Sequence, residues 1–330
     1  MALPVIGAAL SLSGRYAPFG SAIAQGLATW QQLEPRARLV VEDDASDPDG
    51  LAVAFRRLEA RCDLLLGPYS TRLTRAAAGL AAGRDRLLWN HGGAGDDVQR
   101  IAPGHVLSTL TPASRYAEPF LARLEHDRRP LWIASGRGAF SRQVSEGAAS
   151  RAASAVVRVR HEELARREPP APDWVLFSSG TFEEDTATVR WARGLRHPPG
   201  TVCSVAAGIR RFAHQVPDPA GVLGVAQWVP GAAPGVEVGP DEGAFLRAHA
   251  ARHPGLQPDY PAVQAVATAS LALHCLRLAG TVERATLFRA ATGVRVRTLF
   301  GVFQADPATG AQLAHRTVLV RWPGPERVDG

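Results

Sequence analysis

The first thirty residues of the chain constrain its fold more than any other segment. Val5–Leu12 is a near-continuous apolar run, as expected for a strand that is buried on both faces. Ser13–Gly20 interrupts this run, and Ser21–Gln32 then carries apolar residues at helical spacing. Open α/β sheets begin with such a strand, loop and helix, and their ligands bind at the carboxyl ends of the strands. The loop holds two aromatic rings and a hydroxyl but no phosphate-binding or hydride-transfer residues, so we expect binding without chemistry.

Strand-like and helix-like segments alternate through the rest of the chain. This alternation predicts parallel sheets that are covered by helices. The segments expected as strands are Leu39–Glu42, Leu64–Leu66, Leu87–Trp89, Leu131–Ala134, Trp174–Phe177, Val202–Val205 and Val222–Ala226. The segments expected as helices are Leu51–Ala60, Arg72–Ala82, Tyr116–Glu125, Gln143–Ala153, Glu183–Arg193, Gly243–Arg252 and Pro261–Leu278. The last helix is apolar around most of its circumference, so we expect it to be buried.

Three breaks in the pattern predict the domain organisation. A chain of 330 residues is long enough for two domains. The breaks are Ala113–Glu118, the Pro/Gly-rich stretch Val229–Gly239, and Arg295–Phe300. Three hinges in one chain indicate two lobes whose segments interleave. The expected fold is therefore α/β, with two Rossmann-like lobes: residues 1–113 plus 240–297 form lobe 1, and residues 114–239 plus 298–330 form lobe 2.

The composition excludes several classes of function. All 37 basic residues are arginine, and they are scattered among 31 acidic residues, which is typical of a solvated surface and not of a nucleic-acid interface. The absence of lysine excludes a Walker A loop, a Schiff-base lysine and an S-x-x-K acylation centre. The sequence also lacks a G-x-S-x-G elbow and a metal-binding motif. We therefore expect no cofactor, no metal and no enzymatic activity.

The remaining composition bears on location and on the cysteines. No apolar run approaches 18 residues, so the sequence predicts no transmembrane helix. Met1 leads into the first strand within a few residues, so either the protein is cytoplasmic or a secretory leader preceded this chain. Cys62 and Cys275 lie in apolar patterns and are expected to be buried thiols.

Loops with polar or glycine-rich sequences follow the predicted strands. Gly67–Thr71 offers hydroxyls and free N–H groups at a helix N-terminus, which suits a carboxylate, although capping by Ser70 or Thr71 is an alternative. Asn90–Gly95 could bring its backbone close to a ligand, or form a flexible turn. In the second half, Gly136–Ser141 and Ser178–Asp185 occupy equivalent places. We interpret these loops as candidate parts of one site.

In their order and spacing, these residues resemble the type I periplasmic binding proteins, specifically the branched-chain amino-acid and amide-binding receptors. The resemblance covers nearly the whole chain. Its motifs are Ile6-Gly7, Leu12-Ser13-Gly14, Phe19-Gly20, Asp43-Asp44, Asp47-Pro48, Gly67-Pro68-Tyr69-Ser70-Thr71, Asn90-His91-Gly92-Gly93, Gly180-Thr181-Phe182-Glu183-Glu184-Asp185, Gly224-Val225-Ala226-Gln227-Trp228, Asp259-Tyr260-Pro261-Ala262-Val263-Gln264 and Phe300-Gly301-Val302-Phe303.

The resemblance implies two α/β lobes that are joined by three crossings and clamp a ligand in a cleft between them. It implies a small-molecule ligand such as an amino acid or amide, delivery to a membrane ABC permease, and a periplasmic location if a signal peptide preceded this chain. Some members instead sense amides in the cytoplasm and control a regulator, which is the alternative function.

By position, the resemblance also implies particular ligand-binding residues. Ser70 and Thr71 match the hydroxyl that holds a ligand carboxylate, with Tyr69 beside them. Gly92, Gly93 and Ala94 match the adjoining backbone stretch. Phe19 and Phe140 match aromatic walls of the first and second lobe. The remaining candidates, all in the second lobe, are Thr181, Phe182 and Ala207.

The sequence departs from the family pattern at Ala207. Members that bind amino acids commonly place an acidic residue there, to pair with the ammonium group of the ligand. A buried ammonium needs such a partner. Two interpretations remain: either Glu183, Glu184 or Asp185 supplies the negative charge, or the ligand has no ammonium group.

Overall fold

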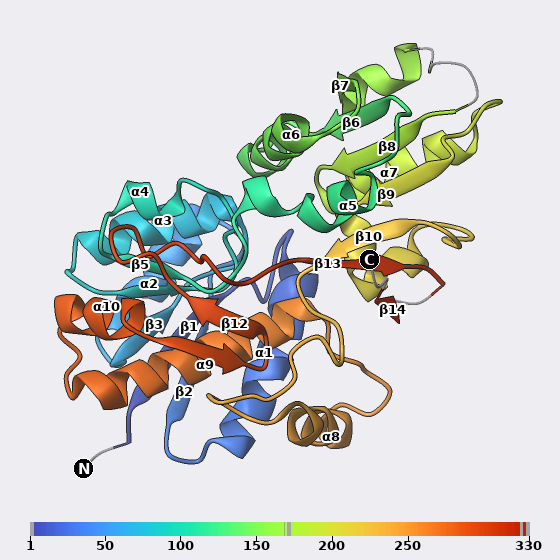
Figure 1. Cartoon of the computed structure of the whole chain (residues 1–330). Helices are drawn as coiled ribbons and strands as arrows, with labels where there is room; N and C mark the ends of the chain where they lie inside the picture. Colours follow the sequence, from blue (N-terminus) through green and yellow to red (C-terminus); the bar gives the residue numbers. More distant parts are fainter. Residues whose placement is uncertain (1–2, 168, 170–172, 324–325, 328–330) are drawn as a thin grey trace. The chain divides into compact units, whose positions relative to one another are not determined.

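The computed structural model describes residues 3–167, 169, 173–323 and 326–327 (Figure 1). The chain divides into two compact units, each built from separate stretches of sequence. Unit 1 comprises Met1–Thr111 and Pro230–His315, and unit 2 comprises Pro112–Val229 and Arg316–Gly330. The chain therefore passes between the units three times, as the sequence predicted.

Unit 1 contains a five-stranded parallel sheet in the order β2-β1-β3-β4-β5. Its strands are β1 (Val5–Leu10), β2 (Arg38–Asp43), β3 (Leu64–Leu66), β4 (Leu88–Asn90) and β5 (Val106–Ser108). Strand β2 pairs with one edge of β1, whereas β3 pairs with its other edge and is followed by β4 and β5. The strand order thus reverses between β1 and β3, and such a switch point is where open α/β sheets bind ligands, beyond the carboxyl ends of the strands.

Helices cover the sheet of unit 1. They are α1 (Ala17–Leu33), α2 (Pro48–Glu59), α3 (Thr71–Ala82), α4 (Val98–Ile101), α8 (Glu242–Arg252), α9 (Tyr260–Ala279) and α10 (Arg284–Thr292). Leu58 of α2 and Leu73 of α3 pack into one core cluster with Leu65 and Leu88 of the sheet. Asp47 caps the start of α2, because its carboxylate accepts the backbone N–H groups of Asp49 and Gly50.

The long helix α9 forms the centre of unit 1, and its predicted burial is confirmed. By length and composition it is the one helix in the described part of the chain that could cross a membrane, but 72% of the tested window is buried, as in a core helix. Helix α9 packs against α1. Gly26 permits this close contact, because a Cβ at that position would lie only 2.9 Å from the Cβ of Ala262.

Unit 2 contains a seven-stranded sheet in the order β14-β13-β10-β9-β8-β6-β7. Its strands are β6 (Leu131–Ser135), β7 (Val156–Arg160), β8 (Val175–Ser179), β9 (Thr201–Ser204), β10 (Leu223–Ala226), β13 (Val318–Arg321) and β14 (Glu326–Arg327). The helices are α5 (Glu118–Arg123), α6 (Ala139–Arg151) and α7 (Phe182–Arg193). Strand β13 pairs antiparallel with both β10 and β14, and the other neighbouring strands pair parallel. The strand order reverses between β6 and β8, which defines a second switch point.

The structure moves two of the predicted domain boundaries. Residues 295–304, which include the third expected hinge, form the antiparallel hairpin β11 (Arg295–Thr298) and β12 (Gly301–Gln304) within unit 1. Val238 pairs with Thr298 in the same unit. Residues 230–239 and 298–315 therefore belong to unit 1 and not, as expected, to the second lobe. The expectation was wrong because contacts between residues far apart in the sequence hold these segments in unit 1: Val238 pairs with Thr298, and the Gln312 amide donates to the Thr109 carbonyl.

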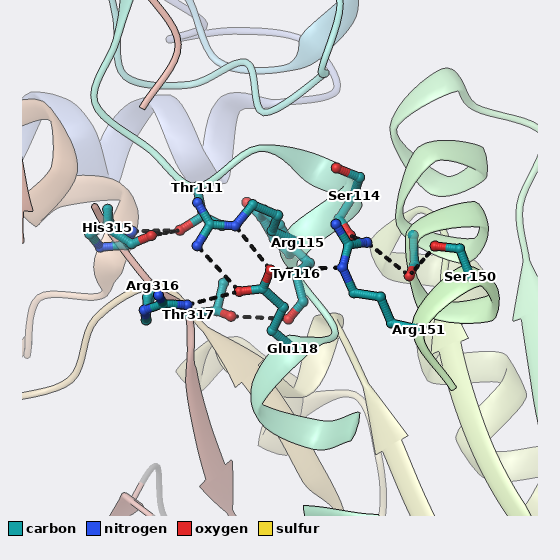
Figure 2. Close-up of polar contacts among 11 residues, drawn as sticks. Thr111, Ser114, Arg115, Tyr116, Glu118, Ser150, Arg151, His315, Arg316 and Thr317 are labelled. Atoms are coloured by element: carbon teal, nitrogen blue, oxygen red, sulfur yellow. Dashed lines mark hydrogen bonds and ion pairs between the residues drawn. The ribbon is translucent and has the colours of Figure 1, made fainter. Parts of the chain in front are cut away.

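Polar contacts fix the chain on each side of two crossings (Figure 2). In unit 1, the Thr111 hydroxyl lies 2.6 Å from Nδ1 of His315 and donates to the His315 carbonyl at 3.2 Å. In unit 2, the Thr317 hydroxyl donates to the Tyr116 carbonyl at 3.0 Å, and Arg316 contacts Glu118 at 3.3 Å. The crossings at Thr111 and at His315 thus have neighbouring anchors in each unit.

Candidate ligand-binding loops

The loop after β3 presents Ser70 at the start of α3. The Ser70 hydroxyl accepts the backbone N–H of Leu73 at 3.3 Å, so it caps the helix, which was one of the two predicted explanations. Its backbone has φ of 87° and ψ of 143°, a conformation that L-residues rarely adopt. The Ser70 N–H donates to the Gly92 carbonyl at 3.0 Å, which holds this conformation. Strain of this kind is concentrated at binding sites.

Thr71 is the first residue of α3 and is 8% exposed. Its hydroxyl oxygen accepts the N–H of Gly95 at 3.1 Å. The lone pair facing Gly95 is therefore occupied, while the hydroxyl proton remains available to a further acceptor. The Ser70 hydroxyl keeps its proton in the same way, so both side chains can donate to a ligand carboxylate.

Asn90, the only asparagine in the chain, organises the neighbouring loop after β4. Its buried Oδ1 accepts the N–H groups of Gly92 at 3.1 Å and Gly93 at 2.8 Å. Its Nδ2 donates to the Gly93 carbonyl at 2.8 Å and to the Ser108 hydroxyl at 2.7 Å. The backbone N–H groups of Gly92 and Gly93 are therefore bound inside unit 1.

The glycines of this loop are explained by contact with the loop after β3. A Cβ on Gly92 would lie 2.3 Å from the Pro68 carbonyl oxygen, and one on Gly93 would lie 2.3 Å from Oγ1 of Thr74. These glycines thus let the loop pack closely against the loop after β3. Ala94 is 6% exposed. Ligand contact by Gly92, Gly93 or Ala94 stays a prediction.

His91 lies fully buried in the same loop, and burial lowers its pKa from 6.5 to about 4. The unfolded chain therefore binds a proton more readily than the folded chain between these two pH values. We expect the free energy of unfolding to fall by up to about 3 kcal/mol as the pH drops from about 6.5 to about 4.

Urea unfolding across this pH range tests the expectation. The loss of stability should shrink in His91→Gln and persist in the control His214→Gln, because His214 is exposed. An equal loss in His91→Gln and in the unmodified chain would show that another group causes it.

Aromatic side chains gather at the switch point of unit 1. Phe19 stacks on Tyr69 with ring centres 4.5 Å apart, and Tyr16 meets the edge of Tyr69 at 6.2 Å. The Tyr69 hydroxyl hydrogen-bonds to Tyr260, whose pKa is raised to about 12, mainly by burial. The structure thus brings together the predicted residues Phe19 and Tyr69. It adds Tyr260, for which the sequence offered only its place in the Asp259-Tyr260-Pro261 motif.

The acidic residues after β2 have structural partners. The Asp43 carboxylate accepts the N–H of Leu12 at 2.9 Å and the Ser13 hydroxyl at 2.6 Å. Asp44 accepts the Ser11 hydroxyl at 2.7 Å. These contacts fasten the loop after β1 to the end of β2, as expected for residues at a strand end.

In unit 2, Phe140 lies in the first turn of α6, beyond the carboxyl end of β6. Its half-buried ring packs edge-on against Tyr116, with ring centres 5.1 Å apart. The Gln227 amide donates to the Tyr116 hydroxyl, which fixes that ring. Phe140 thus lies on a rigid support next to the second switch point.

Thr181 and the acidic residues that follow it hold the start of α7. The Thr181 hydroxyl accepts the N–H of Glu184 at 3.2 Å, and the Glu184 carboxylate accepts the N–H of Thr181 at 2.8 Å, forming a capping box. Asp185 is 1% exposed and accepts the Ser178 hydroxyl at 2.6 Å and the N–H of Ala206 at 3.0 Å. Burial raises the pKa of Asp185, and the nearby His161 partly opposes this shift.

Phe182 and Ala207 pack into the core of unit 2. The Arg211 guanidinium lies 5.0 Å from the centre of the half-buried Phe182 ring. Ala207 is fully buried, and its carbonyl accepts the indole N–H of Trp322 at 3.0 Å. Because the Ala207 side chain has no exposed surface, the expectation that it contacts a ligand is not supported. Ligand contact by Phe182 and Thr181 stays a prediction.

Comparison with solved structures defines the class of fold. The substrate-binding protein of the branched-chain amino-acid transporter of Streptococcus pneumoniae, solved with isoleucine, superposes with a TM-score of 0.82 at 13% identity, covering 99% of this chain and 98% of its own. The leucine-binding protein of Thermotoga maritima gives a TM-score of 0.83 at 14% identity, covering 99% and 97%. A solute-binding protein of an ABC transporter from R. palustris, solved with 4-hydroxybenzoate, gives 0.81 at 14%, covering 99% and 96%.

These matches show that the chain has the fold of ABC-transporter solute-binding proteins. The fold expected from the resemblance to type I periplasmic binding proteins is thereby confirmed. Neither a protein-family model nor a curated protein matches the sequence.

Proposed function

We propose that this chain is the solute-binding receptor of an ABC transporter and captures a small ligand that carries a carboxylate. The observation that carries the proposal is the position of the candidate residues: in each unit they follow strands that flank a switch point, within the fold of solute-binding proteins. Unit 1 offers Phe19, Tyr69 and Thr71, and unit 2 offers Phe140. The isoleucine and 4-hydroxybenzoate named for two similar structures share a carboxylate, which supports the chemical class.

The remaining parts of the proposal follow from the family that the sequence resembles. Ligand binding favours a hinge motion of the chain, as the resemblance implies. The protein works in the periplasm, delivers its ligand to a membrane permease and carries out no chemical step. A cytoplasmic sensor of amides or amino acids on the same fold is the alternative, and the true start of the gene distinguishes the two, because a leader sequence favours transport.

Titration of the purified chain with a ligand panel tests the proposal. The panel comprises L-isoleucine, L-leucine, benzoate, 4-hydroxybenzoate, acetamide and urea, followed by calorimetry and by the melting temperature. We expect saturable binding of at least one carboxylate and a raised melting temperature. An unchanged melting temperature and no heat of binding across the whole panel would contradict the proposal.

The Thr71 hydroxyl provides a residue-level test. Thr71→Val removes the donor while keeping the shape, and should weaken carboxylate binding by about 1.5–3 kcal/mol, or roughly 10-fold to 150-fold. Thr71→Ser retains the hydroxyl and should keep most of the affinity. Equal dissociation constants for Thr71→Val and the unmodified chain would show that the carboxylate binds elsewhere.

A further inference from the structure

The structure addresses the question that the sequence left open, namely which group would pair with a ligand ammonium. Of the three carboxylates that follow Thr181 in the first turn of α7, Glu184 is half-buried and Asp185 is buried, and both have partners within unit 2. The Glu184 carboxylate accepts the N–H of Thr181, and its Oε2 lies so near Gly136 that a Cβ there would be 2.5 Å away. Asp185 is 1% exposed, and its two oxygens accept Ser178 and Ala206 separately. These two carboxylates stabilise the fold of unit 2 and are not positioned to receive a cation.

The turn after β9, where an acidic residue would otherwise stand, is closely packed. Ala207 is fully buried, and a Cβ on Gly208 would lie 2.0 Å from the Val225 carbonyl oxygen. A Cβ on Gly224, in the neighbouring strand, would lie 2.2 Å from the Ala207 carbonyl oxygen. Position 207 therefore has no space for a carboxylate side chain.

Positive charge accompanies the aromatic rings in both units. In unit 1, the Arg15 guanidinium lies 5.8 Å from the ring centre of Tyr16, which itself contacts Tyr69. In unit 2, the Arg211 guanidinium lies 5.0 Å from the ring centre of Phe182. A guanidinium near a ring attracts an anion and repels an ammonium, and so offsets the attraction that a bare ring exerts on a cation.

We infer that the ligand is a small carboxylate with an apolar or aromatic body and no ammonium group. This inference rests on the proposed function and specifies its ligand. The stacked Phe19 and Tyr69 rings supply apolar surface, and the Thr71 hydroxyl supplies a donor to the carboxylate. An amino acid would have to bury its ammonium beside carboxylates that already have partners, at a cost that binding does not recover.

Matched ligand pairs that differ only in the amino group provide the test. Calorimetry on the full chain compares 4-methylpentanoate with L-leucine, and 3-phenylpropanoate with L-phenylalanine. In at least one pair the acid should bind at least about tenfold more tightly than the amino acid, because only the amino acid carries the unpaired charge. The neutral 3-phenylpropanamide should bind more weakly than its acid.

Two variants examine the charges. Arg211→Gln should weaken binding of the preferred acid about threefold to tenfold and change binding of the amide less, whereas the exposed control Arg247→Gln should alter neither. Glu183, exposed in the first turn of α7, is the third acidic side chain that the sequence offered. Glu183→Gln should leave the preference for the acid unchanged.

The outcomes separate the inference from the function on which it rests. The inference would be overturned if the amino acids bound as tightly as their acids, or if Glu183→Gln abolished the binding of the amino acids. The receptor function would stand in either case. If no ligand of these pairs and none of the wider panel binds, the proposed function fails, and the inference fails with it.

Discussion

Replacing Asn90 by leucine is expected to lower the free energy of unfolding by about 3–5 kcal/mol. The buried Asn90 amide satisfies the N–H groups of Gly92 and Gly93, the Gly93 carbonyl and the Ser108 hydroxyl. Leucine has a similar size but no polar atom, so these four groups would lose a partner inside unit 1. A buried polar group without a partner costs about 1–3 kcal/mol, and relaxation of the loop offsets part of the sum.

Urea unfolding checks this expectation, with Asn90→Asp and Gln257→Leu as comparisons. Asn90→Asp keeps an acceptor for the two glycine N–H groups but buries a carboxylate against the Gly93 carbonyl oxygen, so its loss should be at least as large. Gln257 is exposed, and its replacement should change stability by less than about 0.5 kcal/mol. A loss below about 1 kcal/mol for Asn90→Leu would contradict the organising role given to Asn90.

Replacing Asp185 by alanine is expected to cost about 3–5 kcal/mol of folding stability. This carboxyl joins two loops of unit 2, because it accepts both the Ser178 hydroxyl and the N–H of Ala206. Burial raises its pKa, so the surroundings disfavour the negative charge while they require the hydrogen bonds. Asp185→Asn should therefore cost much less than Asp185→Ala, about 1 kcal/mol.

Denaturant unfolding of both variants separates charge from hydrogen bonding. Asp49→Ala is the matched control, because Asp49 also lies in the first turn of a helix but is exposed, and it should cost less than about 1 kcal/mol. If Asp185→Asn were as damaging as Asp185→Ala, the negative charge itself would be required, and the account of this buried group would be wrong.

Local patterns predicted most of the regular structure. All seven strands expected after β1 are present within one or two residues, since apolar runs bounded by loops leave little ambiguity. Strands β5, β7, β11, β12, β13 and β14 were not predicted, and the alternating arginine and valine residues of β11 were interpreted as a hinge. The error at β11 arose because the pairing of Thr298 with Val238, which ties the hairpin to unit 1, joins residues far apart in the sequence.

The sequence indicated individual candidate residues of the site, but it did not indicate which of these residues contact one another or their supports. The sequence pointed to Phe19 and Tyr69 separately, while their stacking depends on strands β1 and β3 lying side by side. The role of Asn90 depends on Ser108, eighteen positions later in the chain. Ala207 was selected by its position after β9, but the contact of its carbonyl with Trp322 is a tertiary feature.

Calorimetric titration followed by mass spectrometry of the recovered ligand tests the central claim most directly. The account predicts that the intact chain binds one small carboxylate from the ligand panel or the matched pairs per molecule, and that this ligand is recovered unchanged. It further predicts that Thr71→Val weakens this binding while Thr71→Ser does not. Recovery of a chemically altered ligand would contradict the claim of a receptor without chemistry, and the absence of binding by every carboxylate tested would contradict the claim of a carboxylate receptor.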